Sequence, residues 1–181
     1  MATETASGYG IGGTAGWTIG GALGGAIAAA AFGLLMWAFD PEIVEAAIPA
    51  IYGFDQSTAI GMTIHLLHGA ILGIIFGFIV TRPAVLGVVS TDVETEIVSE
   101  TGLALRLIAA GFVFGLALWA VLPVIVLPVW VATLGTDAAG QFPAIAVESM
   151  FGHMLFGLVL GLVFAVVADL SDRAITTTSL E

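Results

Sequence analysis

The chain has 181 residues, of which 59% are hydrophobic and 9% charged, and its mean hydropathy is +1.13. A soluble domain carries about one quarter charged residues, so this composition excludes an ordinary water-soluble protein. Only 3 basic residues oppose 14 acidic ones and cysteine is absent, which excludes direct nucleic-acid binding, disulfides, iron–sulfur clusters and thiolate metal sites.

Four apolar stretches are long enough to cross the hydrocarbon core of a bilayer, which needs about 20 helical residues. Backbone polar groups in lipid must be satisfied within the segment, and these stretches lack the alternation of a membrane barrel. The sequence therefore predicts an all-α, integral membrane four-helix bundle. The predicted spans are residues 17–39, 59–80, 103–121 and 144–167.

The segments between the spans are assigned in chain order. Residues 1–16 are predicted to be a partly disordered tail, without the positively charged start of a signal peptide. After the first span, Asp40 and Pro41 are typical of a helix N-cap and first helical position, so a short outer helix is expected. Residues 81–102 are predicted to be a cytoplasmic loop, and residues 169–181 a C-terminal tail.

Residues 122–134 are apolar and contain two prolines, Pro123 and Pro128. One interpretation is an outer re-entrant segment, buried against a second copy of the protein. The alternative is a direct extension of the third helix with proline kinks. The pattern leaves both open.

The few basic residues predict the orientation in the membrane. Arg82 follows the second span, Arg106 lies near the start of the third, and Arg173 follows the fourth. Because basic residues concentrate on the cytoplasmic side, both termini are expected to be cytoplasmic and the location to be the plasma membrane. Acidic residues occur on both sides, which is typical of proteins from extreme halophiles.

Two motifs recur along the chain. The residues Phe32-Gly33-Leu34, Trp37-Ala38 and Pro41 return 82 positions later as Phe114-Gly115-Leu116, Trp119-Ala120 and Pro123. The pattern H-x-x-x-G-x-x-L-G-x-x-F begins at His65 and again at His153, 88 positions later. We therefore expect two tandem two-helix repeats, residues 17–80 and 103–168. Each repeat crosses the membrane twice, so the two should have the same orientation.

Small residues at intervals of four are predicted to form the contacts between helices, because close approach drives helix association in lipid. The sets are Gly20/Gly24, Gly21/Gly25, Gly69/Gly73/Gly77, Gly111/Gly115 and Gly157/Gly161.

The candidate site consists of the paired histidines His65 and His153, which the repeat places at similar depth. Ionisable residues within a span are functional candidates. Each histidine follows a methionine by three residues, Met62 and Met150 respectively, so the two side chains share a helix face. His68 has no repeat partner and is predicted to be a packing residue.

Three functions fit this pattern. His65 and His153 would be the axial ligands of one haem b, for electron transfer or support of a respiratory complex, with Gly69 and Gly157 leaving room for the macrocycle. Alternatively, the His and Met pairs bind Cu(I) or pass a cation or proton, aided by Glu148 near the outer end of the fourth span. In the third interpretation the histidines only pack helices and no cofactor is bound.

No motif of a hydrolase is present, so a redox subunit is the enzymatic role left open. The four spans and the repeated H-x-x-x-G helices resemble small haloarchaeal multi-pass membrane proteins. The resemblance implies a helical membrane fold and brings no assigned activity or site. The expected partners are the lipid bilayer, further copies of the chain, and a respiratory-chain membrane protein.

Overall fold

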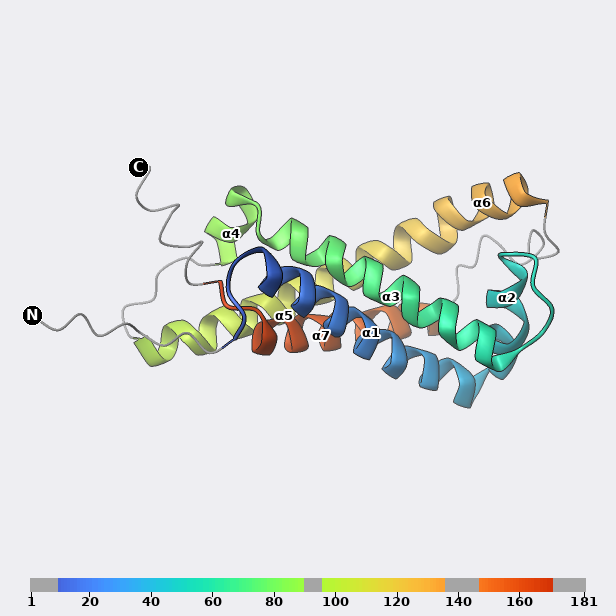
Figure 1. Ribbon diagram of the computed structural model, residues 1–181, viewed down its shortest axis with the longest axis horizontal. Helices are drawn as coiled ribbons and strands as arrows, with labels where there is room; N and C mark the ends of the chain where they lie inside the picture. Colours follow the sequence, from blue (N-terminus) through green and yellow to red (C-terminus); the bar gives the residue numbers. More distant parts are fainter. Residues whose placement is uncertain (1–9, 90–95, 136–146, 171–181) are drawn as a thin grey trace, which may run out of the picture.

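The structure is a computed structural model that describes residues 10–89, 96–135 and 147–170, with the side chains of 96–101 and 147–148 left out (Figure 1). Within these ranges the chain is helical and has no strand, which confirms the predicted all-α class. The elements are α1 (Gly13–Phe39), the π-helix η1 (Ile43–Ala47), α2 (Ile48–Ala50), α3 (Thr58–Val80), α4 (Pro83–Val89), α5 (Glu96–Val121), the π-helix η2 (Leu122–Val126), α6 (Leu127–Leu134) and α7 (Val147–Val167).

Four helical stretches are long and apolar enough to span a bilayer: Gly13–Phe39, Thr58–Val80, Gly102–Leu134 and Ser149–Val167. The four predicted spans are therefore confirmed, with different ends. The first begins four residues earlier than predicted, and the third is much longer. The predicted start of the fourth, at residues 144–146, lies outside the described residues.

Helix α1 is the central element of the bundle. It packs along its length against both α3 and α7, whereas the backbones of α3 and α7 lie further apart in the described residues and meet through large side chains such as Phe76 and Phe164. Helix α5 packs against α7 and meets α3 only sparsely. The start of α1 and the ends of α3 and α7 lie at one end of the molecule, and α2 and α6 lie at the other (Figure 1).

The glycines of α1 form two adjacent stripes, one of which faces α7 and the other α3. A Cβ on Gly24 would lie 3.1 Å from Leu160 Cδ1 on α7. A Cβ on Gly25 would overlap the carbonyl oxygen of Gly69 on α3. A side chain at Gly25 would force α3 away from α1, and one at Gly24 would require Leu160 to shift, which confirms the predicted packing role of these glycines. In the second hairpin, which consists of α5 and α7, the same close helix packing depends on Gly111, Gly115, Gly157 and Gly161.

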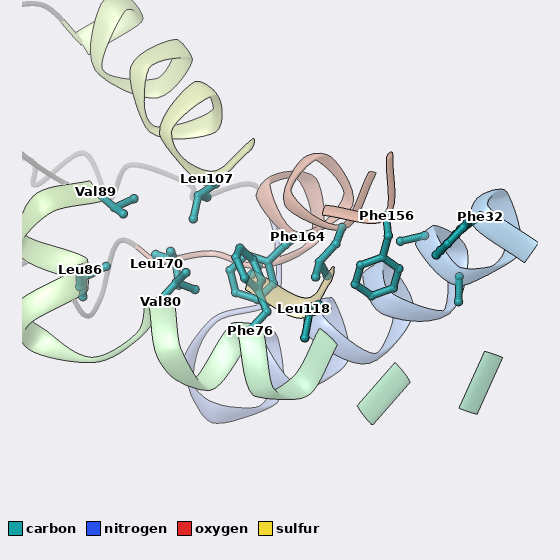
Figure 2. Close-up of a cluster of buried hydrophobic side chains, with 14 residues drawn as sticks. Phe32, Phe76, Val80, Leu86, Val89, Leu107, Leu118, Phe156, Phe164 and Leu170 are labelled. Carbon is teal, nitrogen blue, oxygen red and sulfur yellow. The ribbon is translucent and has the colours of Figure 1, made fainter. Parts of the chain in front are cut away.

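The buried core runs along the bundle between these helices (Figure 2). Phe76 and Phe164 lie in its middle, in edge-to-face contact with ring centroids 5.3 Å apart. Leu86 and Val89 close one end, and they belong to α4, which forms in the segment predicted to be a loop. The end of the bundle is therefore covered by residues that follow the second span.

Two further contacts tie this end together. The Arg106 guanidinium donates from Nη1 to the carbonyl of Val89 over 3.1 Å, so α5 is bonded to the end of α4. Ile11 pairs with the backbone beside Ala168: its N–H donates to the carbonyl of Val167 over 2.9 Å. The N–H of Asp169 in turn donates to the Ile11 carbonyl over 3.0 Å. Ile11 and Asp169 thus belong to the folded bundle, although both were predicted to be parts of the tails.

The segments that follow α1 and α5 are both helical and both contain a π-helical turn. The predicted outer helix after Asp40 is present, and it buries Val44, Ile48 and Pro49. Residues 122–134 extend α5 as η2 and α6 without turning back, so the extension with prolines is the arrangement that forms. The π-helical turn at Pro123 accommodates a residue that cannot donate a backbone hydrogen bond.

Candidate functional site

The two predicted histidines lie on the helices that flank α1. His65 is on α3 and His153 on α7, and each lies within two helical turns of the start of its helix. Both of these helix starts lie toward the end of the molecule that carries α2 and α6 (Figure 1). Both histidines therefore lie toward the same end of the molecule, and their depth in the membrane stays a prediction.

Phe32 of α1 contacts both imidazoles. Its ring centroid lies 5.5 Å from that of His65, at an interplanar angle of 77°, and 5.0 Å from that of His153, at 65°. Both are edge-to-face contacts of the kind aromatic rings prefer. Among the described residues no hydrogen bond or ring contact joins the two imidazoles directly. The histidines expected to face each other thus share a phenyl ring from the helix that lies between theirs.

His65 has an unusual polar environment. Its Nε2 is buried and has no hydrogen-bond partner in the described part of the chain. The ring lies over Gly33 of α1, where a Cβ would come within 3.2 Å of its Cδ2 and within 2.8 Å of the Met62 Sδ. The glycine therefore lets a thioether and an imidazole lie side by side against α1.

His153 is oriented by its own helix. Its Nδ1 donates to the carbonyl of Ser149 over 2.7 Å, one turn earlier on α7. Because a carbonyl only accepts hydrogen bonds, this contact assigns the proton to Nδ1 and, in the neutral ring, the lone pair to Nε2. A backbone partner of this kind holds the second nitrogen ready to bind a metal. Met150 lies on the same helix three residues before His153 and is half-buried.

The glycines predicted to border a cofactor are occupied by helix contacts. A Cβ on Gly69 would overlap Ala29 of α1, and one on Gly157 would overlap the carbonyl oxygen of Gly111 of α5. The space beside them is filled by the neighbouring helix. In the structure they bring helices together and leave no gap of their own.

His68 has its own hydrogen-bond partner, Tyr52. The Tyr52 hydroxyl and His68 Nε2 form a hydrogen bond, and the centroids of the two rings lie 5.6 Å apart. Burial raises the pKa of Tyr52, so the phenol stays protonated at neutral pH. Trp130 of α6 packs edge-on against Tyr52 at 6.1 Å. His68 therefore has a partner for Nε2, as expected for a satisfied residue, and its packing role stays a prediction.

Sequence reasoning missed three residues of this region, which are Phe32, Gly33 and Gly152. A Cβ on Gly152 would overlap the Phe32 ring, so this glycine makes the room in which the phenyl lies. Phe32 and Gly33 belong to the motif repeated at Phe114 and Gly115, which was the available signal. The side chain of Glu148, the predicted aid at the mouth of the site, lies outside the described part.

The donor set available here is small and soft. No group of three or more His, Cys, Asp or Glu side chains within residues 10–89, 96–135 and 147–170 could hold a metal ion. An ion bound at His65 or His153 would therefore need thioether sulfur as well. Hard cations such as Mg²⁺ would not be served by these ligands.

Comparisons with protein-family models, with curated proteins and with solved structures find no match to this chain. Function is therefore inferred from the geometry and chemistry of the residues alone.

Proposed function

We propose that this multi-pass membrane protein binds Cu(I) at two half-sites within the membrane. The α3 half-site consists of Met62 and His65, and the α7 half-site of Met150 and His153. The observation that carries the proposal is the buried Nε2 of His65, which has no hydrogen-bond partner and belongs to a ring that lies beside the Met62 sulfur. An unsatisfied buried polar atom costs roughly 1–3 kcal/mol, and a bound ion would satisfy it. Imidazole and thioether are ligands that suit Cu(I).

The α7 half-site supports the same reading from a different observation. The Ser149 carbonyl fixes the His153 ring with its proton on Nδ1, which leaves the lone pair of Nε2 for a ligand. The two half-sites would handle a soft ion together, either storing it or passing it across the membrane.

We also propose that the two hairpins are tandem repeats in the same orientation. Residues related by the offsets of 82 and 88 make matching contacts. Ala29 lies against Gly69 in the first hairpin, as Gly111 lies against Gly157 in the second. Gly33 lies against His65, and Gly115 lies against the backbone of His153. A duplication would account for both half-sites at once.

Haem b, the first function considered from the sequence, is less well supported by this geometry. A macrocycle ligated by both histidines would need the space that Phe32 and α1 occupy. A single ion needs no such space. Haem binding with electron transfer is therefore the competing outcome that the experiment below distinguishes from Cu(I) binding.

In our proposal the end of the bundle with Arg82 and Arg106 faces the cytoplasm, by the preference of basic residues for that side. The half-sites then lie toward the outer face of the plasma membrane. We also propose that the protein associates with further copies of itself and with a membrane protein of the respiratory chain.

The test is Cu(I) binding by the detergent-purified protein, measured by competition with a chromogenic Cu(I) chelator. Absorption spectra of the oxidised and reduced protein are recorded on the same sample. We expect His65→Ala and His153→Ala each to lower the Cu(I) affinity of its own half-site by about tenfold or more, since even outer-shell changes cost roughly 10–100-fold. Met62→Leu and Met150→Leu should weaken binding in the same direction.

The matched control is His68→Ala, which removes an imidazole one turn further along α3 whose Nε2 is already bonded to Tyr52. It should bind Cu(I) as the wild type does. Equal loss in His68→Ala and His65→Ala would refute the assignment. A Soret band that disappears in both His65→Ala and His153→Ala would replace copper by haem, and absence of both signals would leave the histidines with a packing role.

A further inference from the structure

The Phe32 side chain occupies a defined position that the sequence motif did not anticipate. Its side chain is 6% exposed. Its ring lies in the notch that Gly152 leaves on α7, where any Cβ would overlap it. Figure 2 shows Phe32 at the end of the buried core, beyond Phe156. The ring is therefore held in place by packing from the helix that carries His153.

The equivalent phenylalanine in the second hairpin has a different ring partner. Phe114, 82 positions later, contacts Phe76 with ring centroids 5.5 Å apart and has no ring contact with a histidine among the described residues. The position equivalent to Gly152, 88 residues earlier, is Ile64. A branched side chain there leaves no notch for a phenyl ring. The contact of one phenylalanine with two imidazoles is thus a feature of one hairpin only.

Geometry sets what this ring does to a bound ion. Nitrogen–metal bonds to imidazole are about 2 Å long, so one ion shared by two histidines brings their Nε2 atoms to within about 4 Å of each other. The Phe32 ring packs edge-on against both imidazoles, at 5.5 Å and 5.0 Å, so a movement that brings both rings onto one ion would also have to displace or slide past this phenyl ring.

We propose that Phe32 is a gate that keeps the α3 and α7 half-sites separate, so that an ion passes between His65 and His153 only when the ring moves aside. This inference rests on the proposed Cu(I) function and adds its regulation. Phe32 is a positioning residue in this scheme. It binds nothing, but it determines whether the half-sites act as two sites or as one.

The experiment compares wild type, Phe32→Ala and Phe32→Leu, with Phe114→Ala as the matched control. Cu(I) stoichiometry is measured by chelator competition, and the number of imidazole nitrogens per ion by X-ray absorption spectroscopy. Wild type should bind one ion per half-site, each with a single imidazole. Phe32→Ala should bind one ion through both imidazoles, with affinity raised about tenfold or more. Phe114→Ala should keep the wild-type coordination.

Phe32→Leu controls for misfolding, because leucine preserves apolar packing but lacks the ring. This variant should shift the Cu(I) coordination in the same direction as Phe32→Ala. Two results would overturn the gate and leave the copper proposal intact: unchanged coordination in Phe32→Ala and Phe32→Leu, or two imidazoles on one ion already in the wild type. Failure of the wild type to bind Cu(I) would instead refute the proposed function, and the gate with it.

Discussion

The three histidines of this protein have three different environments, and those of His65 and His68 are made by residues that spacing within their own helix does not indicate. His65 lies over a glycine of α1, His153 is fixed by a carbonyl of its own helix, and His68 is bonded to a tyrosine 16 residues earlier. Imidazoles in lipid are costly unless their polar atoms have partners. The histidine with an unpartnered buried nitrogen is therefore the one on which chemistry is expected.

The Tyr52–His68 bond provides a test of stability at the residue scale. Tyr52→Phe keeps the ring against Trp130 and removes the hydroxyl, leaving His68 Nε2 without its partner. We expect a loss of about 1 kcal/mol in the free energy of unfolding, as for other hydrogen bonds in membrane proteins. The measurement is unfolding in mixed detergent micelles.

A double-mutant cycle with His68→Ala controls for unrelated effects of each substitution. The two losses should combine to less than their sum, because both remove the same bond. Strict additivity would show that the bond does not couple the two residues.

The positions of the histidines on their helices were predictable, but the phenyl ring that both contact was not. The repeat offsets and the helical period place His65 and His153 at matching depth. The contact with Phe32 depends on α1 lying between α3 and α7, which is a property of the assembled bundle. Periodicity within one helix carries no information about which neighbour it will meet.

At the scale of elements, the glycine stripes set how closely the helices pack. Gly25→Ala should destabilise the bundle by on the order of 1–3 kcal/mol, because its Cβ would overlap the Gly69 carbonyl and the helices would have to separate. Thermal unfolding in detergent measures the loss.

Gly102→Ala is the matched control, since it is also a helical glycine and a Cβ there meets nothing within 4 Å. It should be neutral or slightly stabilising, because alanine favours the helix by about 0.5–1 kcal/mol over glycine. Equal destabilisation by the two substitutions would contradict the packing role of the α1 stripe.

The spans themselves were predictable because length and hydropathy determine them, and so were the glycine contacts. The elements at the ends of the bundle were harder. Helix α4 forms in a segment predicted to be a loop, since its helicity depends on burying Leu86 and Val89 against the other spans. The extension of α5 through Pro123 requires a π-helical turn, which no propensity scale anticipates.

At the scale of the whole molecule, the bundle departs from the symmetry that the proposed repeats would suggest. Helix α1 packs closely on α7, yet the equivalent pair, α5 and α3, barely meets. At the offsets of 82 and 88, Arg106 corresponds to Gly24, which lies against α7, and Ile64 corresponds to Gly152. Both positions exchange a glycine that admits a close neighbour for a larger side chain, which fits the sparser contact of α5 with α3.

The arrangement of the helix ends predicts the accessibility of single cysteines, which are informative because the chain has no cysteine. Asp55 lies in the turn before α3, and Arg82 follows it at the other end; both are exposed. With the proposed orientation, a membrane-impermeant maleimide should label Asp55→Cys in intact cells and Arg82→Cys only after permeabilisation.

The reverse pattern would invert the proposed orientation and leave the fold unchanged. Labelling of both cysteines from the same side would contradict the prediction that α3 spans the membrane between them.

The close pairing of α1 with α7 has a consequence for how the protein assembles. Membrane insertion proceeds from the N-terminal side, so α1 enters the bilayer first among the four spans and its principal partner on one face enters last. Until α7 enters, Gly20, Gly24 and Phe32 lack their partners on that helix, and the backbone pairing of Ile11 with Ala168 cannot form. Assembly therefore ends when the first and the last helix of the bundle, α1 and α7, pack against each other.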